Sequence, residues 1–208
     1  YATRLTKYDQ MRKMYEILKA DPDSRRAVIG INNPAHDFHD YESRDICCTL
    51  NLIWQIRNGK LNLTGTMRSN DILLGLPYDL TQFTFLQSVL AKWLGVEVGE
   101  YCHFAANLHA YKRDWDKLKE IAGSATAPSK TPIRSMPAWD IADIDETYAD
   151  IERFFVIEKK LRDSKCPSFE MAISFKDQIG LKSNVLYDLL VDVILPFQSR
   201  KLKKNKEL

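Results

Sequence analysis

The sequence predicts one α+β domain over residues 1–208, and three observations lead to that prediction. The chain has 208 residues, 45% of them hydrophobic, so it is large and apolar enough for one domain with a core. Segments with helical spacing of apolar residues alternate with short β-branched runs. The sequence contains neither an internal repeat nor a second set of apolar segments large enough for an independent core.

The first 45 residues predict a helix, a strand and a loop. Apolar residues recur at helical spacing over 6–20, and Asp21-Pro22-Asp23 ends that pattern. The β-branched run over 27–31 is typical of a strand. Residues 32–45 are polar and contain Pro34, so we expect a loop there.

A β-hairpin is the next predicted element. Residues 46–56 and 61–67 are strand-like, and Arg57-Asn58-Gly59-Lys60 joins them. Asn-Gly is favoured in tight hairpin turns because both residues tolerate a positive φ. The sequence therefore predicts two antiparallel strands here.

Further segments follow the hairpin. A core-facing helix is predicted over 80–94, where Gly95 ends it, and a strand pair or one long strand over 97–111. The stretch 123–139 contains three prolines and is expected to be a long surface loop. Beyond it, the pattern favours a helix over 146–161, an apolar segment over 184–196 and a basic tail over 200–208.

Composition excludes several functional classes. Thirty Lys and Arg against 28 Asp and Glu give a net charge of +2, too balanced for a protein that nucleic acid or an anionic membrane holds chiefly by its net field. The sequence lacks an apolar run of about 18 residues, and its first residues lack the apolar core of a signal peptide. We therefore expect a cytoplasmic protein with no membrane partner and no stable nucleic-acid partner.

The cysteines and histidines predict no metal site. Cys47, Cys48, Cys102 and Cys166 are too few and too irregularly spaced for a disulfide framework or a CxxC site, which leaves a single reactive thiol as an option. Two histidines and two aspartates occur in 36–40, but such side chains in a polar loop are more often solvated.

Several polar residues stand in strand-like context, and they belong to five short motifs that occur in order. Over roughly residues 1–115 these motifs resemble thymidylate synthase and its nucleotide hydroxymethylase relatives: Asp23-Ser24-Arg25-Arg26, Gly59-Lys60-Leu61, Arg68-Ser69-Asn70-Asp71, Leu74-Gly75-Leu76-Pro77 and His109-Ala110-Tyr111. The resemblance implies that family's fold, a large twisted mixed sheet flanked by helices, with one sheet face packed in a homodimer. Residues 116–208 show no such likeness and are read as a divergent C-terminal part, and an N-terminal part of the family domain is expected to be absent upstream of Tyr1.

The resemblance implies that Cys48 is the catalytic nucleophile. Registering the chain on Gly59 and Arg68 places the family's cysteine at Cys48, with Cys47 in place of a proline and Thr49 in place of a histidine. In the family this thiolate adds to C6 of a pyrimidine nucleotide and makes C5 nucleophilic. Arg68 is the candidate for lowering the pKa of the thiol, because a nearby cation favours the charged form of sulfur.

The same resemblance assigns the nucleotide and folate contacts. It implies that Arg68 and Ser69 bind the substrate phosphate together with Arg25 and Arg26 from the other subunit, since guanidinium groups offer paired donors to phosphate oxygens. His109 and Tyr111 are two residues apart, so we expect them on one strand face, where the family uses them to hold the sugar hydroxyl. The implied co-substrate is 5,10-methylenetetrahydrofolate, and its contacts would be Asp71, whose main-chain amide would also touch the base, and Asn107, which stands where the family usually has an acidic residue.

Asp79 occupies the position at which thymidylate synthases carry an asparagine that reads uracil. A carboxylate has no donor for O4 of uracil, whereas it can accept from the 4-amino group of cytosine and from a protonated N3. Such a pair also stabilises the protonated N3, which helps a thiolate to add at C6. Within the family, aspartate here is what cytidylate hydroxymethylases carry.

The sequence therefore predicts a hydroxymethyltransferase that acts on a cytidylate, with dCMP as the first choice. Cys48, Asp79 and Arg68 are its expected catalytic residues. Three alternatives stay open: a CMP hydroxymethylase, a thymidylate synthase or dCMP methylase, and a non-catalytic paralogue that binds nucleotide or RNA.

Overall fold

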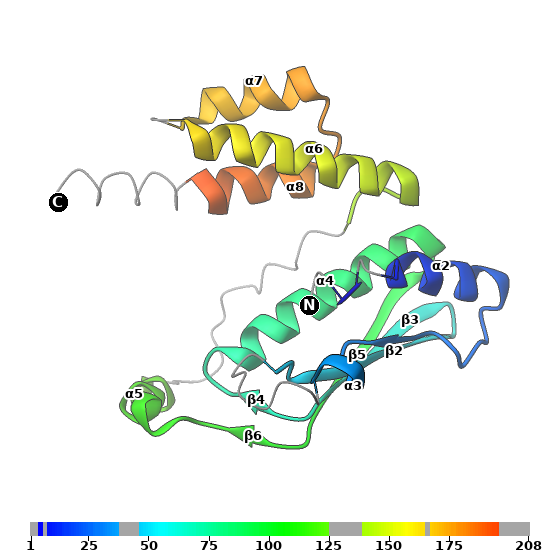
Figure 1. The fold of residues 1–208 in the computed structure, drawn as a ribbon, viewed down its shortest axis with the longest axis vertical. Coiled ribbons are helices and arrows are strands. Elements are labelled where there is room, and N and C mark those ends of the chain that lie inside the picture. The colour runs from blue at the N-terminus through cyan, green and yellow to red at the C-terminus, as the bar shows by residue number, and fades with distance from the viewer. Residues whose placement is uncertain (1–3, 6–7, 38–45, 125–138, 165–166, 196–208) are drawn as a thin grey trace. The chain divides into compact units, whose positions relative to one another are not determined.

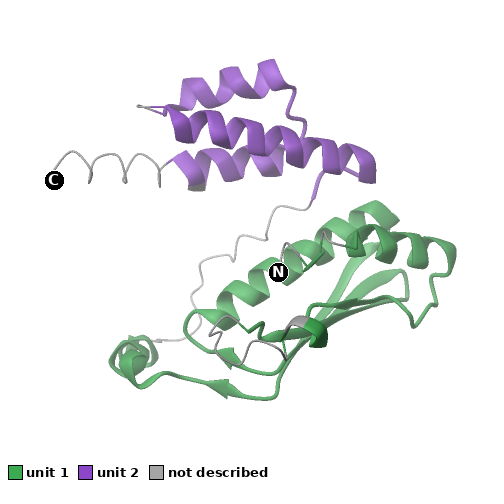
Figure 2. Cartoon of the chain, viewed as in Figure 1, with its two compact units in different colours: residues 1–136 green, residues 137–208 purple. Residues whose placement is uncertain are grey.

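The computed structural model describes residues 4–5, 8–37, 46–124, 139–164 and 167–195. The chain divides into two compact units, residues 1–136 and 137–208 (Figure 2). One domain over 1–208 stays a prediction. None of the helices in the described ranges is long and apolar enough to span a lipid bilayer.

A four-stranded mixed sheet forms the centre of unit 1 (Figure 1). The strand order is β1-β2-β3-β5, in which β1 and β3 run antiparallel to β2 and β5 runs parallel to β3. This arrangement confirms the predicted α+β class with a mixed sheet and flanking helices. The strands are β1 (Val28–Gly30), β2 (Thr49–Arg57), β3 (Lys60–Met67) and β5 (Glu97–Ala105).

The hairpin between β2 and β3 forms as predicted. Asn58 and Gly59 have φ values of 51° and 72°, which a two-residue hairpin turn requires. The register places Arg57 opposite Lys60. Strand β2 begins at Thr49 rather than at residue 46, so the cysteine pair lies just ahead of the strand.

Two helices pack on one side of this sheet, α2 (Gln10–Ala20) and α4 (Gly75–Leu94) (Figure 1). Apolar side chains spaced at helical intervals make the contact, and burial of such surface contributes about 25 cal/mol per Å². Helix α4 starts five residues before the predicted helix, and it can include Pro77 because that residue lies in the first turn, where its missing N–H would have no helical partner. Buried apolar residues include Met11, Met14 and Leu18 of α2, and Phe83, Leu90 and Trp93 of α4.

The other side of the sheet is more open. Val28, Val98 and Phe104 expose 41%, 50% and 57% of their surface there. Because side chains alternate between the two faces of a strand, these residues point away from α2 and α4. The predicted homodimer contact through one sheet face stays a prediction.

Small elements join the sheet to the rest of unit 1. Strand β4 (Asn70–Asp71) pairs in parallel with β6 (Leu108–His109) as a separate two-stranded sheet. The segment predicted as loop contains one helical turn, α3 (Pro34–Asp37). The chain continues as η1 (Lys112–Asp114) and α5 (Trp115–Ser124), which the periodicity did not predict.

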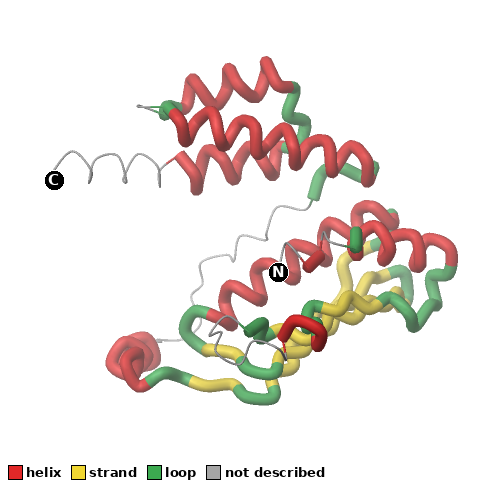
Figure 3. The backbone as a smooth tube through the Cα atoms, in the orientation of Figure 1, coloured by secondary structure: helices red, strands yellow, loops and turns green. Residues whose placement is uncertain are grey.

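The described part of unit 2 is helical, whereas the strands belong to unit 1 (Figure 3). Its elements are α6 (Ile144–Asp163), α7 (Phe169–Ile179), α8 (Asn184–Leu189) and the π-helical turn η2 (Leu190–Ile194). Helix α6 confirms the predicted helix over 146–161, and the apolar segment from 184 forms α8 and η2. Most of the proline-containing loop and the whole basic tail lie outside the described residues.

Helix ends in unit 2 are defined by side chains. Asp143, Ser168 and Ser183 each accept a hydrogen bond from a backbone N–H of the helix that follows.

The buried carboxylate of Asp150 accepts hydrogen bonds from the backbone N–H groups of Lys182 and Ser183. That carboxylate therefore fixes the segment between α7 and α8 against α6.

Candidate active site

Cys48 lies in the bend that leads into β2. The backbone N–H of Arg68 donates to the carbonyl oxygen of Cys48 at 2.9 Å, which makes the two residues neighbours across the β2–β3 pair. The register shifts between Thr49 and Asn51, so Leu50 is an extra residue in β2. Such a β-bulge reorients the side chains on one side of it. Thr49 points into the core and is fully buried.

The Arg68 guanidinium lies along the backbone ahead of Cys48. Its Nε donates to the carbonyl oxygen of Cys47 at 3.0 Å, and its Nη2 donates to that of Ile46 at 2.9 Å. The cation is thus held within one residue of the predicted nucleophile, and its partners in the described structure are carbonyl oxygens rather than a sulfur. Its effect on the Cys48 thiol stays a prediction.

Cys47 is held in a polar cluster that the sequence reading did not identify. Asp37, which is 8% exposed, accepts hydrogen bonds from two nitrogens of Arg4, at 2.7 and 2.5 Å. The Cys47 thiol donates to Oδ2 of the same carboxylate at 3.5 Å. Burial raises the pKa of the Cys47 thiol, and the Asp37 carboxylate raises it further. Cys47 therefore has the properties of a protonated thiol rather than a nucleophile.

The predicted sugar and phosphate ligands meet at the end of β3. Ser69 Oγ lies 3.4 Å from Nδ1 of His109, although 40 residues separate them. The rings of His109 and Tyr111 pack edge to face with centroids 5.0 Å apart. Strand β6 ends at His109, so the two residues do not share a strand face as expected. Tyr111 lies next to His109 through the contact between their rings. The Arg113 guanidinium lies over the Tyr111 ring, 4.6 Å from its centroid.

Asp71 is held at the start of α4. Its carboxylate accepts hydrogen bonds from the backbone N–H groups of Leu73, Leu74 and Gly75, at 3.2, 3.0 and 3.4 Å. Burial raises the pKa of Asp71, but these donors outweigh it and hold the pKa below its usual value. Asn107 is exposed, and its carbonyl oxygen accepts from the backbone N–H of Asn70. Of the two predicted folate contacts, Asp71 therefore lies on β4, and Asn107 lies directly ahead of β6.

Asp79 lies on the second turn of α4 and is 5% exposed. Two side-chain amides donate to it, one to each oxygen. Asn70 Nδ2 lies 2.6 Å from Oδ2, and Gln82 Nε2 lies 2.9 Å from Oδ1. Burial raises the pKa of Asp79, while the two amides and the nearby His103 oppose that rise.

His103 and Tyr101 on β5 form the other polar pair beside Asp79. The Tyr101 hydroxyl lies 2.7 Å from Nδ1 of His103. Burial lowers the pKa of His103, while Asp79 acts to raise it, and burial together with Asp79 raises that of Tyr101. Neither residue was predicted as part of the site, because outside the motifs a tyrosine and a histidine on a strand give no functional signal. For Asn70 the sequence did give an indication of a functional role, because this residue lies inside the motif that contains Arg68, Ser69 and Asp71.

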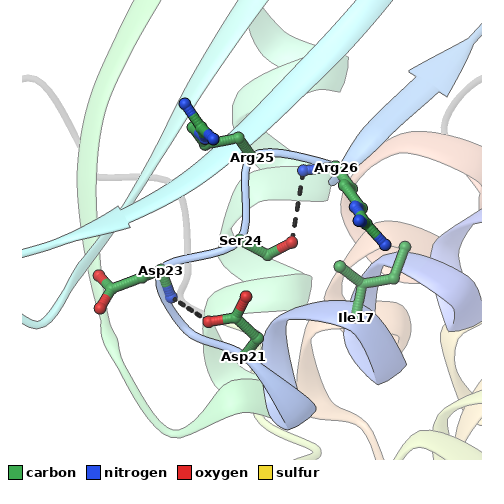
Figure 4. Close-up of a pocket in the computed structure, with 6 residues that line it drawn as sticks. All are labelled: Ile17, Asp21, Asp23, Ser24, Arg25 and Arg26. Atoms are coloured by element: carbon green, nitrogen blue, oxygen red, sulfur yellow. Dashed lines mark hydrogen bonds between the residues drawn. The ribbon is translucent and has the colours of Figure 1, made fainter.

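Arg25 and Arg26 line a shallow, open pocket between α2 and β1, together with Ile17, Asp21, Asp23 and Ser24 (Figure 4). Ser24 Oγ accepts from the backbone N–H of Arg26 at 3.3 Å. Both arginines are exposed, and their side chains point away from one another. They do not join the Cys48 cluster of the same chain: Trp54 pairs with Ala27 next to them, and six extended residues, about 20 Å, separate Trp54 from Cys48.

The described residues contain no cluster of three or more His, Cys, Asp and Glu side chains able to hold a metal ion. Of the segment 36–40 with its two histidines and two aspartates, the part from Phe38 onward lies outside the described residues. Asp37 of that segment is paired with Arg4. The co-substrate that the motifs imply is organic and needs no metal ligand set.

Comparison with known proteins agrees with the resemblance that the motifs indicated. A thymidylate synthase family model matches residues 2–159. Deoxyuridylate hydroxymethyltransferase of Bacillus phage SP01 is 44% identical over 131 residues, which are 60% of this chain and 34% of that protein. Thymidylate synthase of Bacillus subtilis subsp. natto is 35% identical over 114 residues, which are 54% of this chain and 39% of that protein. The chain therefore spans well under half the length of these two relatives.

Proposed function

Because the chain belongs to the thymidylate synthase family, we propose that it transfers a one-carbon unit from 5,10-methylenetetrahydrofolate to C5 of a pyrimidine nucleotide, and that the nucleotide is a cytidylate, dCMP first. The observation that carries the choice of base is the Asp79 carboxylate, buried and bound by an amide at each oxygen. Asp79 presents acceptors where uracil needs a donor. One mismatched polar contact in a buried site costs about 1 to 3 kcal/mol, which is enough to make uracil the poorer base.

Chemistry at the base begins with Cys48. Its thiolate forms a bond to C6, and the electron pair of the C5–C6 double bond moves towards N3, where a proton is taken up. Asp79 is the group that can hold that proton against N3. The raised pKa of the Cys47 thiol supports Cys48 as the nucleophile of the pair, since only the thiolate attacks. We propose Cys48, Asp79 and Arg68 as the catalytic residues.

The binding roles are proposed on the same basis. Ser69 and His109 are in contact, and Tyr111 packs on His109, so one cluster at the end of β3 can receive both phosphate and sugar. Arg68 borders this cluster through its place after β3. Arg25 and Arg26 are exposed, and the backbone next to them lies about 20 Å along the sheet from Cys48, which supports their donation to the site of a second subunit in a homodimer.

The residues at β4 and β6 fit a folate. A carboxylate has about four lone-pair sites, and three backbone N–H groups occupy Asp71, so about one site is left for an N–H of the pterin. The Asn107 side chain is exposed and can supply both a donor and an acceptor. When bound, the folate supplies the carbon that becomes attached to C5.

Hydroxymethylation is proposed rather than methylation for two reasons. The relative from phage SP01 carries hydroxymethyltransferase in its name. Thr49, fully buried, replaces the histidine that follows the nucleophile in the methylating enzymes that the motifs resemble. Water rather than hydride would then reach the exocyclic methylene at C5.

A second candidate is hydroxymethylation of deoxyuridylate. The name of the relative at 44% identity supports it. Burial also raises the pKa of Asp79, and a protonated carboxyl can donate to O4 and accept from N3–H, as an asparagine amide does. The two candidates differ in whether Asp79 is used as a carboxylate or as a carboxylic acid.

Product analysis separates these candidates. The full-length chain is incubated with methylenetetrahydrofolate and dCMP, CMP or dUMP, beside Cys48→Ala, and the nucleotides are examined by mass spectrometry. A gain of CH2O on dCMP that Cys48→Ala abolishes is the expected result. A gain of CH2O on dUMP alone selects the second candidate, a gain of CH2 means a methylase, and nucleotide binding without product means a binding protein.

A further inference from the structure

The base-reading carboxylate of Asp79 is held by two neutral amides from different elements. Asn70 lies on β4, and Gln82 lies one turn further along α4. Each donates to a different oxygen of Asp79, at 2.6 and 2.9 Å. Hydrogen bonds to the ionised form of a carboxylate stabilise that form over the protonated one.

The Asn70 amide is oriented as an ionised Asp79 requires, with its donor towards the carboxylate. Asn70 is 3% exposed, and its Oδ1 is buried without a hydrogen-bond partner among the described residues. An unpaired buried acceptor destabilises a protein. Turning the amide over would place Oδ1 against the carboxylate, which only accepts while it is ionised. The observed orientation is therefore the one that suits a charged Asp79.

Resting on the proposed function, we infer that the amide of Asn70, supported by that of Gln82, keeps Asp79 ionised, so that its carboxylate acts as an acceptor towards the base. The proton shared between Asp79 and the base then resides on N3 of a pyrimidine that carries an amino group. A cytosine protonated at N3 offers two donors to the carboxylate, one from N3 and one from the 4-amino group. It also has a C6 that is more open to the thiolate. Uracil offers one donor, N3–H, and an acceptor at O4.

Loss of the Asn70 donor moves the shared proton back to Asp79. The carboxyl then behaves like the amide of an asparagine and tolerates O4 of uracil. Asn70 is thus a positioning residue that acts through Asp79, and its removal reduces the preference for cytosine rather than abolishing nucleotide binding. Gln82 is half-buried, so water can replace its donor, and its removal has the smaller effect.

Other groups face Asp79 and set its protonation as well. Burial raises the pKa of Asp79 above its usual value, and besides the two amides His103 on β5 opposes that rise. The Tyr101 hydroxyl lies within hydrogen-bond distance of His103, and burial together with Asp79 raises its pKa. All variants below keep these groups, so that differences between them report on the amide donor.

Four variants of the full-length chain test the inference: Asn70→Ala, Asn70→Asp, Gln82→Ala and Asn51→Ala. Asn70→Asp keeps the shape of the side chain while it removes the donor towards Asp79. Asn51, on β2, is the matched control, since its Oδ1 is also buried and unpartnered among the described residues but it makes no hydrogen bond to Asp79 there. The readouts are kcat and KM for dCMP and dUMP, and the pKa of Asp79 from carbon-13 NMR of labelled carboxyl groups, assigned with Asp79→Asn.

For Asn70→Ala and Asn70→Asp we expect kcat for dCMP to fall about ten- to a hundred-fold with a smaller change in KM, a lower ratio of dCMP to dUMP turnover, and a higher pKa of Asp79. Gln82→Ala should change these readouts in the same direction by less, and Asn51→Ala should match the wild type. An Asn70→Asp variant that behaves like the wild type would show that shape alone matters and would overturn the inference. Equal loss of turnover for both nucleotides with an unchanged pKa of Asp79 would overturn it as well.

The NMR readout distinguishes failure of this inference from failure of the proposed function. A wild-type chain that converts only dUMP, or neither nucleotide, refutes the proposed use of dCMP. The titration of Asp79 needs no turnover, and a pKa that does not rise in Asn70→Ala shows that Asn70 does not control the carboxylate.

Discussion

The thiol of Cys47 donates a hydrogen bond to the carboxylate of Asp37, whose pKa the hydrogen bonds from Arg4 hold well below its usual range. Adjacent cysteines are thereby given different properties. The pKa of the Cys47 thiol is raised by burial and by the negative charge of Asp37. Cys48, the next residue, lies in the bend before β2. A neighbouring carboxylate thus keeps the Cys47 thiol protonated, whereas Cys48 is joined to Arg68 through its backbone carbonyl oxygen.

Alkylation should distinguish the two thiols. We expect iodoacetamide at neutral pH to modify Cys48 faster than Cys47, because a raised pKa leaves less thiolate. The rates are measured by peptide mass spectrometry in a Cys102→Ser background, since Cys102 is exposed. In Asp37→Asn the Cys47 rate should rise, because the charge that raises its pKa is gone. Faster modification of Cys47 than of Cys48 in the otherwise wild-type chain would contradict this assignment.

The same carboxylate should make stability depend on pH. The pKa of Asp37 is lower in the folded chain than in the unfolded chain, so its contribution is present above the ordinary carboxyl pKa of about 4 and is lost as the pH falls towards the folded value. Wild type should exceed Asp37→Asn in free energy of unfolding at pH 7, and the gap should narrow below about pH 4. Urea titrations at several pH values measure it. A gap that stays constant down to pH 3 would argue against the pairing with Arg4.

Asp79→Asn should reverse the preference for the base. An amide at this position can donate to O4 and accept from N3–H, so we expect turnover of dUMP to rise relative to dCMP by about ten-fold or more. Ratios of kcat/KM from the two nucleotides report the change. Unchanged discrimination would mean that Asp79 does not contact the base.

Arginine donation between subunits can be tested by complementation. A chain with Arg25→Ala and Arg26→Ala and a chain with Cys48→Ala should each be inactive. Mixing and refolding them together should restore activity, since a hybrid dimer contains one site with intact Cys48 and intact arginines. Each variant refolded alone is the control. A mixture as inactive as its parts would show that the arginines act in their own chain or not at all.

Unit 2 should depend on Asp150. Asp150→Ala leaves the backbone N–H groups of Lys182 and Ser183 without their acceptor, which should cost about 2 to 4 kcal/mol. Hydrogen exchange across α6 to η2, followed by mass spectrometry, measures the loss. Glu152→Ala, an exposed change on the same helix, should stay within about 0.5 kcal/mol of the wild type. Equal exchange in both variants would mean that the Asp150 contacts do not stabilise the unit.

The hairpin and the main helices could be predicted because local rules determine them. Asn58-Gly59 specifies a turn with two positive φ values, and Gly95 ends α4 with a φ of 70°. The start of α4 was missed because it depends on Asp71, four residues ahead, which accepts from the N–H groups of Leu73, Leu74 and Gly75, the first residue of the helix. The spacing of apolar residues, on which the helix prediction rested, carries no information about such a hydrogen bond.

The site was predictable in its residues and not in its pairings. The motifs named Ser69, His109 and Asp79, and the structure brings Ser69 against His109 across 40 positions of sequence. The attachment of Cys47 to Asp37 and of Asn70 to Asp79 depends on tertiary packing between β4, α4 and the segment after β1. No short motif encodes those contacts, and the polar residues involved resemble ordinary loop residues when they are read alone.

Strand β4 consists of two residues, and each holds a different part of α4: Asn70 bonds to Asp79, and Asp71 bonds to the N–H groups up to Gly75. Substitutions at positions 70 and 79 are therefore expected to be epistatic. A lineage that exchanges the carboxylate at 79 for an amide leaves Asn70 facing a second amide, and the benefit of either change depends on the other. Libraries that vary one position at a time would miss the pairs in which base preference changes without loss of activity.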